Sequence, residues 1–425
     1  MSSRKWSLLQ RIMKMDKRNR RGIIAIIGSG MGILWSGAMV FAYPGLMGSY
    51  WREVYSVDAG ATGTVMTLLL FSLGIFMFFS GKWHMKLGTG KCMLIGAAIM
   101  AVALLCLNFA RDMTLVYAFG FLNGASSCFI YGPGLTTAQN WFPDKRGLST
   151  GILNLVFGIS GAIMVPIMNA LLHNYGYVKM NYILMALMSV TFVIASRLTE
   201  MPDKSNMSLE EKEAHAKLLE EVKNAKSGRK MAESKTVGEA LHTKQFWIIW
   251  LVWCFMGAAG ISMVGLSASY AVKLGLSAVV VLAAFNFANG ISRIIAGIMS
   301  DYIGRNLTGA ITFAVAAAAY FMLPNCTSIL SVSVLAACVG FAFGTLFAIT
   351  APLATDLFGL NHFGMIFGLI FTAYGFVGGM AGPALAGFVL KLTGENYAPV
   401  FIYLSVFCLL ATVLIMLAKP NENQL

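Results

Sequence analysis

The sequence predicts an all-α membrane protein with twelve transmembrane helices. Of its 425 residues, 58% are apolar and 12% are charged, about half the charged fraction of an ordinary soluble protein. Apolar stretches long enough to cross a hydrocarbon core of about 30 Å recur along the chain. Because lipid offers no partner for backbone polar groups, these stretches must be helical. We expect spans near 22–48, 58–81, 92–110, 114–140, 148–172, 178–198, 245–272, 277–299, 306–324, 328–355, 363–390 and 398–418.

The distribution of positive charge predicts the orientation of these spans. A basic segment, residues 1–21, precedes the first span, and no cleavage site of a signal peptide follows it. If this segment stays in the cytoplasm, cytoplasmic segments hold 25 of the 31 Lys and Arg residues, five lie outside and Arg293 lies within a span. The positive-inside rule predicts such a bias. We therefore expect an integral protein of the cytoplasmic (inner) membrane with both termini in the cytoplasm.

Composition also excludes several classes of function. The formal charge of +13 does not indicate nucleic-acid binding, because residues 1–21 alone carry +7, and juxtamembrane charge sets topology and contacts anionic lipid headgroups. The seven cysteines show no metal-like spacing, so we expect free thiols, no metal site and no cofactor. No nucleophile with a neighbouring base and no phosphate-binding loop is present, which argues against an enzyme. We expect a monomer in the lipid bilayer.

A polar linker divides the chain into two bundles. Residues 199–244 hold nine basic and nine acidic residues. Within this linker, Ser208 and Glu211 have the spacing of a capping box, which predicts a short solvated helix; a docking site for a partner is the alternative. The predicted organisation is therefore a basic N-terminus (1–21), an N-terminal six-helix bundle (22–198), the linker (199–244), a C-terminal six-helix bundle (245–418) and a tail (419–425).

The two bundles repeat each other weakly at an offset of 216 or 217 residues. The matching pairs are Gly81 and Gly297, Gly88 and Gly304, Phe142 and Phe358, Gly151 and Gly368, Gly161 and Gly378, and Pro166 and Pro383. Six matches at one offset, each in the equivalent helix or loop, indicate two pseudo-symmetric halves. Transporters built from two parallel halves hold their substrate between the halves, near the middle of the membrane.

Arg293 is the charged residue that this arrangement must explain. An arginine at the centre of a span costs about 2.5–3.5 kcal/mol on insertion scales. Asn286, Asn289 and Arg293 are spaced i, i+3 and i+7 and so share one helix face. No acidic residue in any predicted span is placed as its partner, and a guanidinium matches a carboxylate. We therefore expect an anionic substrate to be the partner. The alternative is a structural arginine that binds backbone carbonyls or reaches toward the cytoplasmic side.

Two loops resemble motifs of known transporters. The stretch "GIMSDYIGR" (Gly297–Arg305) resembles the loop motif of the major facilitator superfamily, in which the acidic and basic residues hold the halves together; this implies a gate at Asp301 and Arg305. The first-half copy, "GKWHMKLGTGK", keeps Lys86 but has Met85 where the aspartate belongs. The resemblance therefore implies an asymmetric gate, with a simple turn as the alternative for the first copy.

A second set of motifs resembles the oxalate:formate antiporter family. The loop "NWFPDKRGLSTG" (Asn140–Gly151) is similar to that family's loop after its fourth helix, and adds Asp144 and Arg146 to the predicted gate. Tyr131 stands ten residues before Trp141, as the pocket tyrosine of that family does. The pattern Asn289-Gly-x-x-Arg293 is also similar to prokaryotic monocarboxylate transporters, where the arginine receives the substrate carboxylate. This resemblance implies a substrate site at Arg293, Asn289 and Tyr131.

The organic part of an anion needs an apolar or aromatic wall. Candidates are Phe347, at the offset of Tyr131 in the tenth span, Phe343 one turn earlier, Tyr374 in the eleventh span and Asn154 in the fifth. Ordinary packing is the alternative for each of them.

The sequence departs from these families at the charged positions. Oxalate transporters use a lysine in the eleventh helix, but "FGLIFTAYGFVGG" (Phe367–Gly379) has no charge. One arginine suits one carboxylate, so we expect a monocarboxylate such as lactate, pyruvate or formate. Animal monocarboxylate transporters have an aspartate where this chain has Asn289, and their lysine in the first helix has no counterpart here.

These departures leave the coupling open between two mechanisms. The first hypothesis is proton-coupled symport, with the proton bound beside the anion or at Asp301, Asp356 or His362 near the cytoplasmic ends of the spans. The second is organic-anion antiport of the oxalate/formate type without a proton. Both mechanisms use alternating access by rocking of the two halves.

Overall fold

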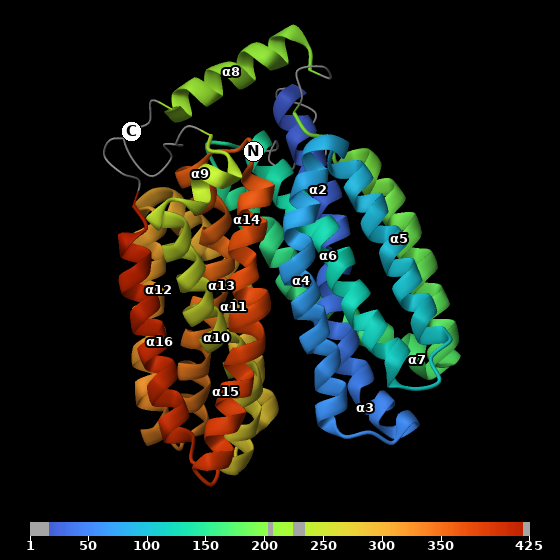
Figure 1. Cartoon of the computed structure of the whole chain (residues 1–425), viewed down its shortest axis with the longest axis vertical. Helices are drawn as coiled ribbons and strands as arrows, with labels where there is room; N and C mark the ends of the chain where they lie inside the picture. Colours follow the sequence, from blue (N-terminus) through green and yellow to red (C-terminus); the bar gives the residue numbers. More distant parts are fainter. Residues whose placement is uncertain (1–16, 203–206, 224–233, 420–425) are drawn as a thin grey trace, which may run out of the picture.

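The computed structural model describes residues 17–202, 207–223 and 234–419, which form helices joined by short loops. Most of the predicted basic N-terminus, parts of the predicted linker and nearly all of the predicted tail lie outside these residues. Figure 1 shows the helices as two bundles side by side, one from each half of the chain.

The first bundle begins with a span of three segments, α2 (Lys17–Gly37), the π-helix η1 (Ala38–Ala42) and α3 (Tyr43–Tyr55). It continues with α4 (Ala59–Leu87), α5 (Thr89–Asn108), α6 (Met113–Trp141) and α7 (Arg146–Leu198). The linker contributes α8 (Leu209–Lys223) and α9 (Val237–Leu241). The second bundle holds α10 (Lys244–Lys273), α11 (Ala278–Ile303), α12 (Arg305–Met322), the short 3-10 helix η2 (Leu323–Asn325), α13 (Ile329–Phe358), α14 (Phe363–Thr372), the π-helix η3 (Ala373–Gly378), α15 (Gly379–Leu392) and α16 (Tyr397–Leu417).

Eleven of the described helices are long and apolar enough to cross a membrane. One of them, α7, is 53 residues long and contains Gly176 with φ of 75°, where two helices meet. Such a backbone conformation suits glycine, which has no Cβ to clash. The sequence predicts two spans here, 148–172 and 178–198, and the break at Gly176 lies between them, so the chain has twelve transmembrane segments.

Helix boundaries follow from local chemistry that repeats in the two halves. Asp58 and Asp112 begin α4 and α6 by accepting hydrogen bonds from Ala61 N and Thr114 N, both at 2.8 Å. The matched pair Gly88 and Gly304 have φ of 77° and 91°, which ends one helix and starts the next within a single residue. The repeat in the sequence thus corresponds to a repeated backbone turn.

The linker lies across one end of the bundles, which we call the linker face and define by α8, α9, the start of α2 and the end of α16 (Figure 1). Ser208 and Glu211 form the predicted capping box: Ser208 N donates to Glu211 Oε2 at 2.7 Å, and Glu211 N donates to Ser208 Oγ at 3.3 Å. The helix is mostly exposed but is held to α2, because Arg21 pairs with Glu211 at 3.3 Å. The predicted domain limits themselves stay a prediction.

Candidate substrate site and gate

A small cavity lies between the two halves, and we call it the central cavity. Its volume is about 20 Å³, enough for about one water molecule. It is lined by side chains of both halves: Val40, Phe41, Leu70, Leu73, Met77, Ser127, Tyr131, Phe157, Phe347, Phe371 and Tyr374. None of these residues carries a formal charge at neutral pH. The conformation described here is therefore nearly closed around the site.

Arg293 lies in α11 beside the central cavity and is 1% exposed. Its guanidinium carbon sits 4.7 Å from the ring centroid of Phe347 and 5.9 Å from that of Phe157, both of which line the cavity. Cations are attracted to the faces of aromatic rings at such distances. The guanidinium therefore reaches the wall of the cavity from behind two aromatic rings, one from each half.

The hydrogen bonds of Arg293 are few for a buried guanidinium. Nη1 donates to the backbone oxygen of Asn154 at 3.0 Å, and Nη2 donates to Asn289 Oδ1 at 3.5 Å. Nε has no partner, and Arg293 makes no ion pair within the described parts of the chain. A guanidinium has five N–H donors, so its donor capacity is largely unused.

Asn154 connects the predicted site residues across the two halves. Tyr131 Oη donates to Asn154 Oδ1 at 2.5 Å, and Asn154 Nδ2 donates to the backbone oxygen of Phe347 at 3.2 Å. Because the Asn154 backbone also accepts from Arg293, Tyr131 and Arg293 are both bonded to one residue of α7. This short path joins α6, α7, α11 and α13.

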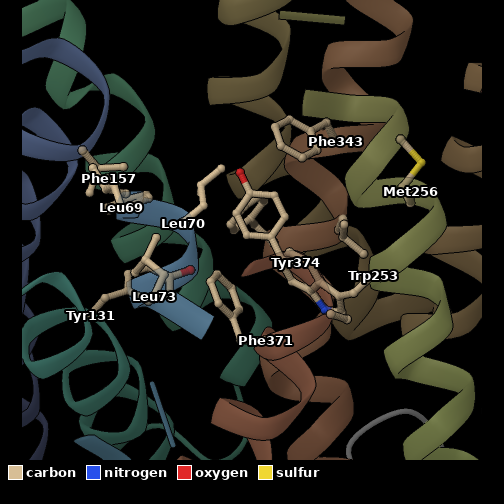
Figure 2. Close-up of a cluster of buried hydrophobic side chains, with 14 of the residues drawn as sticks. Leu69, Leu70, Leu73, Tyr131, Phe157, Trp253, Met256, Phe343, Phe371 and Tyr374 are labelled. Carbon is tan, nitrogen blue, oxygen red and sulfur yellow. The ribbon is translucent and has the colours of Figure 1, made fainter. Parts of the chain in front are cut away.

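Phe347, Phe371 and Tyr374 form the wall of the cavity in the C-terminal half, and Trp253 packs against them from behind the wall. The ring of Trp253 lies 4.9 Å from both Phe347 and Phe371 and 5.5 Å from Tyr374, centroid to centroid. Figure 2 shows Tyr131, Phe157 and the leucines of α4 on one side and these aromatic residues on the other. Sequence reasoning named Phe347 and Tyr374 but missed Phe157, Trp253, Phe371 and Ser127. One turn of helix separates Phe157 from Asn154, which is the signal that could have found it.

Five of the eight predicted substrate residues do not line the cavity. Arg293, Asn289 and Asn154 are joined to one another by hydrogen bonds, and the other two are Phe343 and Asn286. Phe343 is buried inside the C-terminal half, with its ring 5.3 Å from Phe347 and 6.4 Å from Phe285, so it packs behind the wall. Asn286 shares the helix face of Arg293 but is exposed, two turns away. The spacing therefore predicted which residues share one face of α11, but it did not predict how deeply each of them is buried.

At the linker face, Asp301 bridges the two halves. Its carboxylate accepts hydrogen bonds from Gly147 N at 3.2 Å and Leu148 N at 3.0 Å, in the first turn of α7. Arg305 Nη1 also pairs with Asp301 at 2.5 Å. A carboxylate at a helix N-terminus satisfies unpaired N–H groups and interacts favourably with the helix dipole. Asp301 of α11 therefore caps a helix of the opposite half.

Asp356 of α13 completes this gate network, which we define as Arg146, Asp301, Arg305 and Asp356. Its carboxylate pairs with Arg146 of α7 and with Arg305 Nε, the latter at 3.2 Å. Arg146 and Arg305 are 0% and 3% exposed. Two buried cations thus meet two carboxylates, and the network crosses the interface between the halves.

The remaining predicted gate and proton residues lie outside this network. Lys86 is exposed, and Asp144 is half-buried without an ion pair to any residue that the structure describes. His362 precedes α14, and its Nδ1 has no hydrogen-bond partner in the part of the chain that the structure describes. Met85, where the motif has an aspartate, is 48% exposed. In the other copy of the motif Asp301 caps α7, and the equivalent helix for position 85 is α14, which has no side-chain cap at its start.

Backbones of the two halves touch where the repeat places glycines. A Cβ built on Gly81 would lie 2.2 Å from the carbonyl carbon of Gly364, and one on Gly297 would lie 2.5 Å from Gly147 O. Real Cβ atoms do not approach so closely, so only glycine permits these contacts, as in other packed membrane helices. The halves lie against each other near the linker face and diverge toward the opposite face (Figure 1). The path from the linker face to the central cavity is closed.

This arrangement of two helical bundles around a central site, with a closed gate at one face, defines an integral membrane transporter. A family model of the Major Facilitator Superfamily matches residues 24–381 and, in a second match, residues 281–424. The chain belongs to the Major Facilitator Superfamily, whose members are transporters and not enzymes.

Individual relatives and solved structures agree with this assignment. The chain is 25% identical to the oxalate:formate antiporter of Oxalobacter formigenes over 309 residues, which cover 71% of this chain and 70% of that protein. It is 29% identical to monocarboxylate transporter 13 of Rattus norvegicus, over 22% of each chain. The fold is similar to the crystal structure of the superfamily transporter FucP in the outward conformation, with a TM-score of 0.70 at 13% identity, covering 95% of this chain and 100% of that one.

Proposed function

We propose that the protein transports small organic monocarboxylates such as lactate or pyruvate by alternating access, with Arg293 as the group that receives the carboxylate. The observation that carries this proposal is the buried guanidinium of Arg293, which has an unpartnered Nε and makes no ion pair with a described residue. Burying a charge without a counter-charge is costly. An anion that enters the site supplies the missing charge and hydrogen-bond acceptors together.

The uncharged lining of the central cavity supports a single carboxylate. Phe371 and Tyr374 occupy the stretch of the eleventh span in which oxalate transporters have a lysine, and both line the cavity. A second carboxylate would therefore lie against aromatic and aliphatic side chains without a cation beside it, which is unfavourable in a low dielectric. This favours monocarboxylates over dicarboxylates.

The interpretation of Arg293 as a purely structural residue explains less. One backbone carbonyl at 3.0 Å and one amide oxygen at 3.5 Å satisfy a small part of its donor capacity. The guanidinium of Arg293 lies against two aromatic rings of the cavity wall, Phe157 and Phe347. A change of rotamer in either ring would expose the guanidinium to a substrate in the cavity.

We propose proton-coupled symport as the mode of transport. Asp301 and Asp356 already hold arginines in the gate network, so a proton on either carboxylate would weaken the contact between the halves. His362 is the third candidate, because its Nδ1 is free of partners in the described structure. Organic-anion antiport without a proton is the second candidate function, and the similarity to the oxalate:formate antiporter favours it.

Proteoliposomes distinguish these two modes. Acidification outside should drive carboxylate uptake by a symporter into empty vesicles, whereas an antiporter should need a load of organic anion inside.

We further propose that the linker face is the cytoplasmic one, in the inner membrane, and that the protein works as a monomer. The bias of positive charge supports this orientation.

Substitution of Arg293 tests the anchor role. Arg293→Ala should reduce carboxylate uptake by roughly 30-fold or more, because removal of one partner of a buried charge pair costs several kcal/mol. Arg293→Lys should also reduce uptake, because it keeps the charge but loses the planar fork of donors that matches a carboxylate. Arg111→Ala, which changes an exposed arginine, should leave uptake unchanged. Membrane insertion and the elution volume of the purified variants check folding. Full uptake by the Arg293→Ala protein would exclude this function for Arg293.

A further inference from the structure

Two hydroxyl groups at the central cavity have no role in the site described above. Among the buried side-chain oxygen and nitrogen atoms that lack a hydrogen-bond partner in the described residues, two belong to residues lining the cavity, Ser127 and Tyr374. Both residues are almost fully buried, at 1% and 2% exposure. The third hydroxyl of the lining, that of Tyr131, already donates to Asn154.

Position sets these two hydroxyls apart from other buried helical hydroxyls. Thr136 and Ser160 donate to backbone carbonyls of their own helices, at 2.9 Å and 2.7 Å, which is the usual way to satisfy a buried hydroxyl in a membrane helix. Ser127 and Tyr374 make no such bond within the described residues, and unlike other unpaired hydroxyls such as that of Ser72 they line the cavity. An unsatisfied buried hydroxyl costs free energy, so each needs a partner that the protein itself does not supply.

The position of Tyr374 relates it to Arg293. The guanidinium carbon of Arg293 and the ring of Tyr374 both lie within 6 Å of the Phe347 centroid, at 4.7 Å and 5.6 Å. Figure 2 shows the hydroxyl of Tyr374 directed toward Leu70 of the opposite half, into the space between the bundles. Tyr374 also belongs to η3, a π-helical segment, and such segments are frequent at functional sites.

We propose that Tyr374 and Ser127 form a second polar subsite, which binds an oxygen on the carbon next to the substrate carboxylate. The favoured substrates are then 2-oxo and 2-hydroxy monocarboxylates, rather than acids with a plain hydrocarbon chain. Ser127 lies in the N-terminal half and Tyr374 in the C-terminal half, so one substrate oxygen contacts both halves. This inference rests on the proposed function, because Arg293 must hold the carboxylate for the second oxygen to be placed.

A matched series of three-carbon acids tests this subsite. Affinities of propionate, pyruvate and lactate for the purified full-length protein are measured by titration calorimetry. Pyruvate and lactate should bind about tenfold more tightly than propionate, because a site built around hydroxyl groups rejects a ligand that leaves them unpaired. Tyr374→Phe should bring this ratio close to one. Ser127→Ala should lower the ratio in part, and it gives a second test if the tyrosine variant folds poorly.

Tyr403→Phe is the matched control. Its hydroxyl also lacks a hydrogen-bond partner among the described residues, but Tyr403 is not part of the cavity lining, so the ratio should stay as in the wild type. Equal wild-type affinities for the three acids would overturn the subsite and leave the proposed function intact. A Tyr374→Phe protein that binds all three acids more weakly by the same factor would also overturn the subsite. That result is expected if the hydroxyl of Tyr374 holds a structural water and not an oxygen of the substrate. A wild type that binds none of the acids would overturn the proposed function itself.

Discussion

Asp301 and Gly147 belong to opposite halves of the protein, yet Asp301 Oδ1 accepts a hydrogen bond from Gly147 N at 3.2 Å. The same pair of helices is in backbone contact one turn away, because Gly297 packs against Gly147. Closure of the linker face therefore depends on the Asp301 carboxylate at the start of α7 and on Gly147 and Gly297, which have no side chain to separate the two helices.

Loss of the Asp301 carboxylate should destabilise the closed linker face. Asp301→Ala removes the cap of α7 and leaves Asp356 as the only carboxylate paired with Arg305 among the described residues. Loss of a helix cap costs about 1 kcal/mol or more, which changes the ratio of closed to open protein by roughly fivefold. Cysteine-accessibility labelling from both faces should report the shift. Asp144→Ala is the control, since Asp144 makes no ion pair with a described residue; equal labelling of the two variants would contradict the assignment of the gate.

A side chain at Gly297 should open the linker face for a steric reason. Gly297→Val introduces a Cβ 2.5 Å from Gly147 O, which is too close, at a cost of about 1–3 kcal/mol to the closed conformation. Transport should fall because one of the two alternating conformations becomes rare. Gly387→Val is a suitable control, because no atom lies within 4 Å of a Cβ built at Gly387. Normal transport by the Gly297→Val protein, with normal labelling, would show that the close contact is dispensable.

An acidic residue at Met85 should strengthen the closed linker face. Met85 holds the motif position of Asp301 in the first half, and the start of α14 has no side-chain cap. Met85→Asp should add one, worth about 0.5–2 kcal/mol, and labelling from the linker face should decrease. Met85→Asn supplies a capping side chain without a negative charge, so it distinguishes the effect of the cap from the effect of the charge. If Met85→Asp and wild type label alike, the two copies of the motif do not act in the same way.

Docking of α8 on the linker face should weaken in acid. Arg18 Nε donates to His215 Nδ1 at 3.2 Å, which requires a neutral ring. Burial, and then the charge of Arg18, lower the pKa of His215 from 6.5 to about 4. The contribution of His215 to docking is therefore complete above pH 6.5 and is lost as the pH falls toward 4.

Hydrogen exchange of residues 209–223 measures this effect. Between pH 6.5 and pH 4, protection should decrease by at most about tenfold for each pH unit, and by less because the ring is partly exposed. His215→Gln keeps an acceptor for Arg18 but does not titrate, so its docking should not change with pH. The comparison is made at equal pH, which removes the intrinsic pH dependence of exchange. Equal protection of both proteins at pH 5 would contradict the prediction.

Much of the architecture could be predicted from local features of the sequence. The apolar runs, the glycines that end helices and the capping box of Ser208 and Glu211 each act within a few residues, so their effect can be read without the fold. The spacing of Asn289 and Arg293 likewise places them on one face of α11. The break at Gly176 lies in the gap between the predicted spans 148–172 and 178–198.

The composition of the site could be predicted only in part. Trp253 and Phe371 resemble any buried aromatic residues of a membrane helix, and no local pattern distinguishes them from packing residues. Asn286 and Phe343 fit the expected pattern, but the packing of the helices places one in an exposed position and the other behind the cavity wall. The pairing of Asp356 with Arg146 joins residues 210 positions apart, which only helix packing can bring together.

The sequence by itself determined the twelve spans, the two halves and an uncompensated arginine in the eighth span, because membrane insertion and helix formation depend on short-range composition. Only the tertiary structure decided that Asp356 joins Asp301 at the linker face and which hydroxyls face the central cavity. Those contacts lie between helices that are far apart in the chain, and their geometry is set by the glycines at which the two halves meet.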